Sequence, residues 1–122
     1  DGLDEISVSA PTTVIEVREG EVVGEWRVEP DQIGVRSDES HSLKGGDAAE
    51  NLRRMRAILG GDEESAASDA VALNAAAALY VAELASNLKE GLETCRGLLR
   101  AGTALECLQL LAQRSGELTR NA

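Results

Sequence analysis

The first third of the chain alternates apolar and polar residues in two short runs, which is the pattern of β-strands. The runs 13–18 and 22–28 flank the dipeptide Glu19-Gly20, which favours a tight turn. Residues 12–28 are therefore expected to form a β-hairpin. The positions that share a face are Thr13, Ile15 and Val17 on the first strand, and Val22, Gly24, Trp26 and Val28 on the second.

After the hairpin the pattern changes from strand to helix. Pro30, Gly34 and the Ser-rich stretch 36–42 predict an exposed connection. From residue 47 to residue 115 apolar residues recur at three- and four-residue spacing, which predicts about four helices. Three helix starts carry a capping residue that is followed three positions later by Glu: Asp47 with Glu50, Asn87 with Glu90, and Thr103 with Glu106.

The helices differ in how their apolar residues are arranged. The first and third are apolar on one side, stop at Gly60-Gly61 and near Gly102, and should lie on a surface. A helix from about Ser68 to Ser86 is apolar almost all round, so this second helix, around Asn74 to Leu84, should be the most buried of the four. Asn74 within it needs a polar partner. The apolar positions are Ala48, Leu52, Met55 and Leu59 in the first helix, Leu88, Leu92, Cys95 and Leu99 in the third, and Leu105, Leu108, Leu111 and Ala112 in the last, whose end after Gly116 should fray.

Composition narrows the classes of function. The 122 residues suffice for one domain, whose core must be aliphatic because Trp26 and Tyr80 are the only aromatic residues. A net charge of -10 repels phosphate backbones, so nucleic-acid binding is disfavoured. The apolar stretch 70–82 is too short to span a membrane, and no signal peptide is visible, so a cytoplasmic protein is expected. Cys95 and Cys107 are expected to be reduced core residues.

The candidate site is the acid pair Asp4-Glu5, which follows a turn at Gly2. Neighbouring residues of a strand point to opposite faces, but after a glycine turn two carboxylates can converge on one ion. Carboxylate oxygens suit Mg2+, which keeps several of its waters for a phosphorylated substrate to displace. A solvated acidic loop is the alternative. The chain opens without a methionine or a preceding strand and reads as part of a larger protein.

Other polar groups are weaker candidates. Gly45-Gly46-Asp47 resembles a phosphate loop, but Asp47 is expected to cap the helix and would repel phosphate. Arg53, Arg54 and Arg56 form the only basic cluster along the sequence, and a solvated helix face is the preferred interpretation. The single histidine, His41, lies in a Ser-rich loop and gives little support for a Ser-His-Asp triad. Trp26 is expected to pack inward and not to stack on a ligand.

Three segments and the hairpin follow one another in a specific order: DGLDE (1–5), the hairpin, LKGGDAAEN (43–51) and DAVALNAAAALYVAELASNLKEGLE (69–93). Together they resemble the C-terminal third of the anthranilate phosphoribosyltransferase family over nearly the whole chain. The resemblance implies an α/β fold of the nucleoside phosphorylase and phosphoribosyltransferase type. Residues 1–122 would then be the C-terminal part of the large α/β domain, a β-hairpin followed by about four helices, without the small N-terminal helical domain.

The same resemblance implies a glycosyltransferase of tryptophan biosynthesis, which uses Mg2+ to transfer phosphoribosyl from phosphoribosyl diphosphate to anthranilate and usually acts as a homodimer. Asp4 and Glu5 match the family's metal-binding pair. The family's diphosphate loop, ribose-phosphate contacts and anthranilate-binding arginine lie upstream, so this chain is expected to need the missing N-terminal segment for activity. A non-catalytic binding protein of the same fold is the alternative, which the negative charge and the acid pair disfavour.

Overall fold

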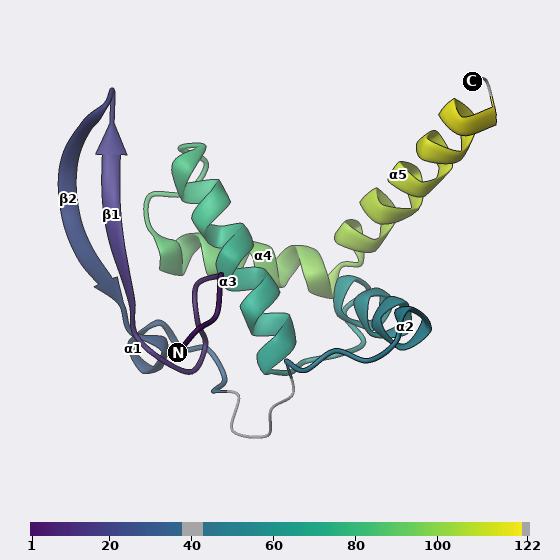
Figure 1. Cartoon of the computed structure of the whole chain (residues 1–122), viewed down its shortest axis with the longest axis horizontal. Coiled ribbons are helices and arrows are strands. Elements are labelled where there is room, and N and C mark those ends of the chain that lie inside the picture. Colours follow the sequence, from purple (N-terminus) through teal and green to yellow (C-terminus); the bar gives the residue numbers. More distant parts are fainter. Residues whose placement is uncertain (38–42, 121–122) are drawn as a thin grey trace.

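The computed structural model describes residues 1–37 and 43–120, which form an antiparallel hairpin beside a group of helices (Figure 1). The N-terminal loop passes beside α3, and α5 projects away from the other helices, far from the hairpin. This arrangement confirms the expected hairpin and the four long helices. The elements are β1 (Thr12–Arg18), β2 (Glu21–Val28), α1 (Pro30–Ile33), α2 (Ala48–Leu59), α3 (Ala66–Val81), α4 (Leu88–Arg100) and α5 (Thr103–Arg120).

The hairpin turns at the predicted dipeptide. Glu19 and Gly20 have φ values of 51° and 86°, and positive φ at both central residues is the geometry of a type I′ turn. The strand register shifts by one residue between Glu16 and Val17. Thr13, Ile15 and Val17 share a face as predicted, but this face is exposed to solvent. The opposite face of the hairpin packs against the helices. Its residues are partly or fully buried: Thr12, Val14, Glu16, Gly24, Trp26 and Val28.

Tyr80 of α3 joins the hairpin to the helices. Its ring packs edge-on against Trp26 with the ring centroids 6.3 Å apart, which confirms the inward orientation predicted for Trp26. Its hydroxyl donates a hydrogen bond of 3.0 Å to Oε2 of Glu16. The other carboxylate oxygen of Glu16 accepts a hydrogen bond of 2.8 Å from Nε of Arg18. Hydrogen bonds from Arg18 and, second, from Tyr80 hold the pKa of Glu16 below its usual range.

Replacing Tyr80 with Phe should raise the pKa of Glu16 toward its usual range, because one donor to the carboxylate is lost. Since the pKa is lower in the folded state, the contribution of Glu16 to stability is present at neutral pH and is lost as the pH falls through the folded-state pKa. Carboxyl-carbon NMR titration measures the change. Arg18→Gln is the comparison and should produce the larger rise; an unchanged Glu16 titration in Tyr80→Phe would contradict the assignment.

The core lies where α3 and α4 pack together beneath the hairpin and the N-terminal loop. Leu73 of α3, Leu92 of α4 and Val8 of the loop are completely buried. The two helices pack tightly at Gly91, where an added Cβ atom would lie 3.0 Å from both the Cβ atom and the carbonyl oxygen of Ala76. The predicted one-sided face of α4, with Leu88, Leu92, Cys95 and Leu99, is confirmed because all four residues are buried.

Helix α3 differs from its prediction in both its bounds and its burial. It begins after Ser65, whose side chain forms a reciprocal capping box with Ser68, and not at Ser68 itself. It ends at Val81 because Glu83 takes a left-handed conformation, with φ of 58°, and the N–H of Leu84 donates to the carbonyl oxygen of Leu79. Helix α3 contains more buried residues than α2 or α4, as predicted, but the expected stretch from Asn74 to Leu84 is wrong because the buried residues lie mainly before Asn74. The buried residues are Ala66, Ala67, Ser68, Asp69, Ala72, Leu73 and Ala76.

Three further differences concern the ends of the chain's elements. Pro30 begins the short helix α1, where a plain connection was expected, since proline suits the first helical turn. Helix α5 begins at Thr103. The N–H of Glu106 donates to the carbonyl oxygen of Gly102, so the residue that precedes the helix is Gly102 and not Thr103, which was predicted to be the capping residue. The helix continues to Arg120, beyond the expected end at 115, and Glu117 bonds both Gln113 and Arg114 there.

Apolar side chains remain exposed on several elements of the described structure. Leu111 and Ala112 face solvent on the projecting α5, where the sequence pattern placed them on an apolar face. Leu52 and Met55 of α2 are about half exposed. Within the described ranges 1–37 and 43–120, no helix combines the length and apolar character that a membrane crossing requires.

Candidate metal centre

The acid pair lies in an exposed bend of the N-terminal loop. Gly2 has φ of 87°, a left-handed conformation that favours glycine, so the predicted turn is present. Asp4 and Glu5 are both exposed, and neither carboxylate forms a hydrogen bond or an ion pair with any residue in the ranges 1–37 and 43–120. Their oxygens are therefore free to bind a cation. No set of three or more acidic, His or Cys side chains gathers as metal ligands within those ranges.

The residues that follow the acid pair are firmly held. The side chain of Asn74 accepts a hydrogen bond of 3.0 Å from the N–H of Ile6 and donates one of 3.2 Å to its carbonyl oxygen. Ser7 is almost completely buried, and its hydroxyl accepts hydrogen bonds from the N–H groups of Ser9 and Ala10 and donates one to Asp1. The sequence indicated that Asn74 needs a partner, but the pattern held no signal for Ser7.

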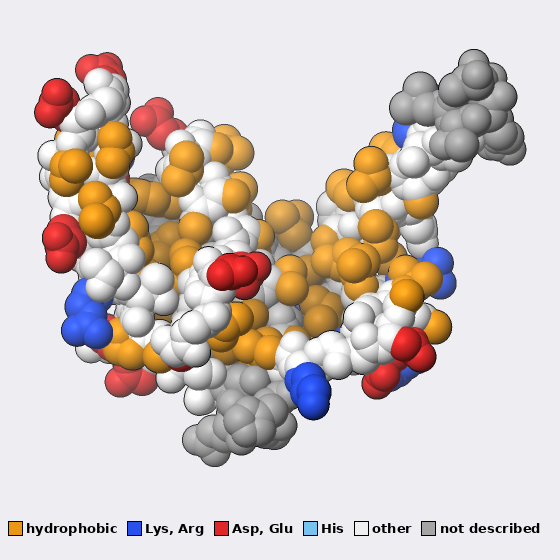
Figure 2. Space-filling model, in the orientation of Figure 1, with side chains coloured by type: hydrophobic (Ala, Val, Ile, Leu, Met, Phe, Trp, Pro, Cys, Tyr) orange, Lys and Arg blue, Asp and Glu red, His pale blue; other side chains and the backbone are white. Residues whose placement is uncertain are grey.

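A largely apolar groove of about 590 Å³ lies between α2 and α3 and adjoins the N-terminal loop that carries the acid pair. Figure 2 shows hydrophobic side chains spread over the central part of the surface, between the hairpin and α5. Glu5 and Asn74 both border the groove, whereas Asp4 is not among its lining residues. The other lining residues in the described ranges are Leu3, Ile6, Val8, Leu43, Gly45, Asn51, Arg54, Met55, Ile58, Leu59, Ala67, Ala70 and Val71.

The loop Gly45-Gly46-Asp47 has the structural role that the sequence favoured. Asp47 caps α2 by accepting a hydrogen bond of 2.8 Å from the N–H of Glu50. The N–H of Gly46 donates to Oδ1 of Asn51, whose Nδ2 donates back to the carbonyl of Gly46. These donors are engaged within the protein, so the loop does not present them to a phosphate group.

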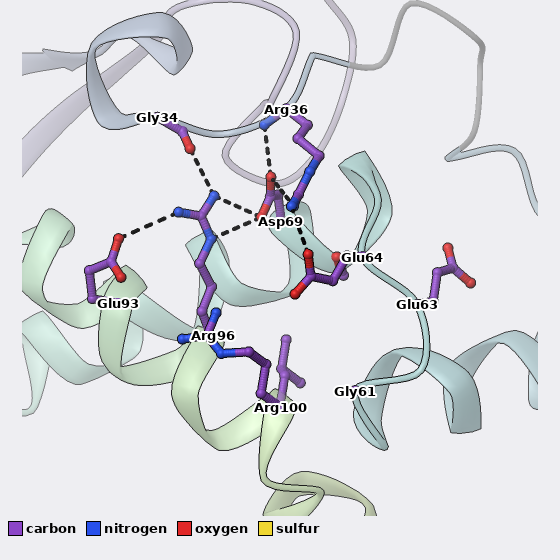
Figure 3. Close-up of a pocket in the computed structure, with 11 residues that line it drawn as sticks. Gly34, Arg36, Gly61, Glu63, Glu64, Asp69, Glu93, Arg96 and Arg100 are labelled. Carbon is purple, nitrogen blue, oxygen red and sulfur yellow. Dashed lines mark hydrogen bonds and ion pairs between the residues drawn. The ribbon is translucent and has the colours of Figure 1, made fainter.

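A second cavity, of about 290 Å³, is bordered by charged residues that are far apart in the sequence (Figure 3). The buried carboxylate of Asp69 accepts hydrogen bonds from the side chains of Arg36 and Arg96, at 3.0 Å for Nη1 of Arg36 and 2.8 Å for Nη2 of Arg96. Arg100 also borders the cavity. Folding therefore creates a second basic cluster, in addition to the one along residues 53–56, from arginines that are far apart in the sequence. The signal in the sequence for this second cluster was Asp69, an acidic residue within an apolar helical run.

The basic residues of α2 lie in different environments. Arg53 and Arg56 are exposed, as predicted, and Arg54 donates hydrogen bonds to Glu63. Burial raises the pKa of Glu63, but hydrogen bonds from Arg54 and Ser65 outweigh this effect and leave the pKa below its usual range. His41 lies outside the described residues, so its predicted exposure stays a prediction.

The two cysteines are free, as predicted, but they lie in different environments. Cys95 is buried in the core, and burial raises the pKa of its thiol. Cys107 is exposed on α5 because that helix packs against the rest of the chain only near its beginning, so its prediction as a core residue is wrong.

The hairpin and its helical layer define this chain as part of an α/β domain. The family model described as "Glycosyl transferase family, a/b domain" matches residues 1–105, and the chain belongs to this family. It is 48% identical over 120 residues to the anthranilate phosphoribosyltransferase of Thermomicrobium roseum, and 41% identical over 118 residues to that of Rubrobacter xylanophilus. Each match covers 97% of this chain and 34% of the relative.

A solved structure supports the same relationship. The crystal structure of anthranilate phosphoribosyltransferase from Thermus thermophilus matches with a TM-score of 0.78 and 34% sequence identity. The match covers 89% of this chain and 32% of that one. This chain thus spans about a third of the length of the relatives that it matches, and the matched part is their C-terminal part.

Proposed function

We propose that this chain belongs to an anthranilate phosphoribosyltransferase and supplies its metal-binding carboxylates, Asp4 and Glu5. The enzyme would transfer phosphoribosyl from phosphoribosyl diphosphate to anthranilate in tryptophan biosynthesis. The observation that carries the proposal is identity of 48% and 41% to relatives of that name across nearly the whole chain. The stretch that the family model matches, residues 1–105, includes the acid pair. A cytoplasmic location and a homodimer belong to the same proposal.

The acid pair fits Mg2+ on chemical grounds. Two free, exposed carboxylates offer the hard oxygen ligands that Mg2+ prefers, and Mg2+ commonly binds through one or two carboxylates while substrate phosphates complete its coordination. When bound, Mg2+ supplies positive charge that offsets the negative charge of a departing diphosphate. Asp4 and Glu5 would hold the ion beside the groove, and the remaining two thirds of the enzyme would supply the donors that bind the phosphates and orient anthranilate.

Asp4→Asn and Glu5→Gln should weaken the Mg2+ dependence of the full-length enzyme and leave its folding intact, because both residues are exposed and have no partners in the described structure. Loss of one charged ligand is expected to raise the Mg2+ concentration for half-maximal turnover by about ten- to a hundredfold. Turnover measured across a Mg2+ titration, together with thermal unfolding, checks both expectations.

Glu25→Gln is the matched control, because Glu25 is an exposed acidic residue of β2, the strand that follows the hairpin turn. Its replacement changes the net charge by the same amount as either single substitution in the acid pair. It should leave the Mg2+ titration unchanged. If the double variant of Asp4 and Glu5 behaves like this control, the acid pair does not bind the metal, and a non-catalytic protein of the same fold becomes the better interpretation.

A further inference from the structure

Asn74 makes an unusual connection between a core helix and the acid pair's loop. It lies in α3 next to Leu73, which is completely buried. Its side-chain amide pairs with the peptide groups of Ile6 as a neighbouring strand would: Oδ1 accepts from the Ile6 N–H at 3.0 Å, and Nδ2 donates to the Ile6 carbonyl at 3.2 Å. Ile6 directly follows Glu5, so this pairing fixes the backbone at the end of the acid pair.

The amide of Asn74 is fully used in this arrangement. A second hydrogen of Nδ2 donates to the carbonyl of Ala70 at 2.9 Å, one turn earlier in the helix. This bond fixes the rotation of the amide, so Oδ1 and Nδ2 cannot exchange places without losing all three contacts. Asparagine is a poor residue for a helix interior. Its presence in the apolar run of α3 is explained by the contacts it makes to the loop and not by helix stability.

The backbone on the other side of Ile6 is also held. The N–H of Ser7 donates to Oγ1 of Thr12 at 3.1 Å, and Val8 is completely buried in the core. Residues 6–8 therefore form a firm support, whereas Asp4 and Glu5 project beyond it into solvent without partners in the described ranges. The direction in which the two carboxylates leave this support depends on how Ile6 is oriented.

We infer that Asn74 is a positioning residue for the metal site: by pairing with both peptide groups of Ile6, it sets the orientation in which Asp4 and Glu5 present their carboxylates to a divalent cation. The inference rests on the proposed function, because it takes the acid pair to be the metal site. Asn74 does not contact the ion in this assignment. Metal affinity is sensitive to such indirect support, and its loss typically weakens binding about ten- to a hundredfold.

The test uses Mn2+ as a paramagnetic substitute for Mg2+ and follows the backbone amide signals of residues 3–6 by NMR in the 122-residue chain. Asn74→Leu keeps a side chain of similar size but removes all three hydrogen bonds, and Asn74→Ser is a second variant in case the first does not fold. In both, the Mn2+ concentration that half-broadens these signals should rise about tenfold. The amide of Ile6 should also exchange with solvent faster, because its acceptor is gone.

Tyr80→Phe is the matched control, since it removes another hydrogen bond that joins α3 to the N-terminal third of the chain. It should leave Mn2+ broadening of residues 3–6 unchanged even where it lowers stability. If folded Asn74→Ser keeps both the slow exchange of Ile6 and the Mn2+ response within about twofold, the positioning role is wrong. If the broadening in the unmodified chain persists after Asp4→Asn and Glu5→Gln, the acid pair is not the metal site, and the proposed function fails with it.

Discussion

Replacing Asp69 with Ala should lower the free energy of unfolding by about 3 kcal/mol. The Asp69 side chain is only 2% exposed, and its two oxygens accept four hydrogen bonds: from the N–H and Nη1 of Arg36, and from Nε and Nη2 of Arg96. Without the carboxylate, the largely buried guanidinium of Arg96 loses one of its negatively charged partners, which destabilises the folded state. We place the effect at the low end of the range for a broken buried pair because Arg36 is half exposed and can be hydrated.

Urea unfolding followed by circular dichroism measures this change. Glu64→Gln is the matched control, because it also removes one negative charge that pairs with Arg36, at 3.2 Å, but its side chain is 59% exposed. An exposed pair of this kind contributes at most about 1 kcal/mol. Equal effects of the two variants would show that burial of Asp69 does not determine its contribution.

Replacing Gly91 with Leu should destabilise the chain by about 3 kcal/mol or more, because it overfills a tight contact between α3 and α4. A Cβ atom at this position already lies 3.0 Å from the Cβ atom and the carbonyl oxygen of Ala76, and the backbone of α3 cannot yield as a flexible side chain would. Larger side chains would force the two helices apart and open the core around Leu73 and Leu92.

Gly97 offers a control within the same helix. A Cβ atom added there meets no other atom within 4 Å, so Gly97→Ala should stabilise the chain by up to about 1 kcal/mol through its higher helix propensity. Thermal unfolding of both variants separates the two effects. The packing argument would fail if Gly91→Leu were as stable as the unmodified chain.

Local patterns were sufficient to predict the hairpin and the starts of α2 and α4. The turn at Glu19-Gly20 and the caps at Asp47 and Asn87 depend on residues within a few positions of one another. The one-sided face of α4 followed from the same short-range spacing. Such features are specified locally, so the sequence alone reports them.

One error was local: α3 ends where Glu83 takes a left-handed conformation, although that position usually carries glycine. The other errors arose where distant residues decide the outcome. The burial of Asp69 depends on Arg36 and Arg96, 33 and 27 residues away in the chain. At the candidate site, the acid pair was predicted from the sequence, but the contact between Asn74 and Ile6 depends on tertiary structure and was not.

The hydrogen bonds that attach the N-terminal third of the chain to the helices join residues far apart in the sequence. Asn74 and Ile6 are separated by 68 positions, Tyr80 and Glu16 by 64, and Arg96 and Gly34 by 62. Closing such long loops loses chain entropy before any contact compensates for it, whereas α3 and α4 are neighbours in the chain. We therefore expect the helical pair to assemble before the N-terminal loop is ordered, so that the acid pair acquires its geometry late in folding.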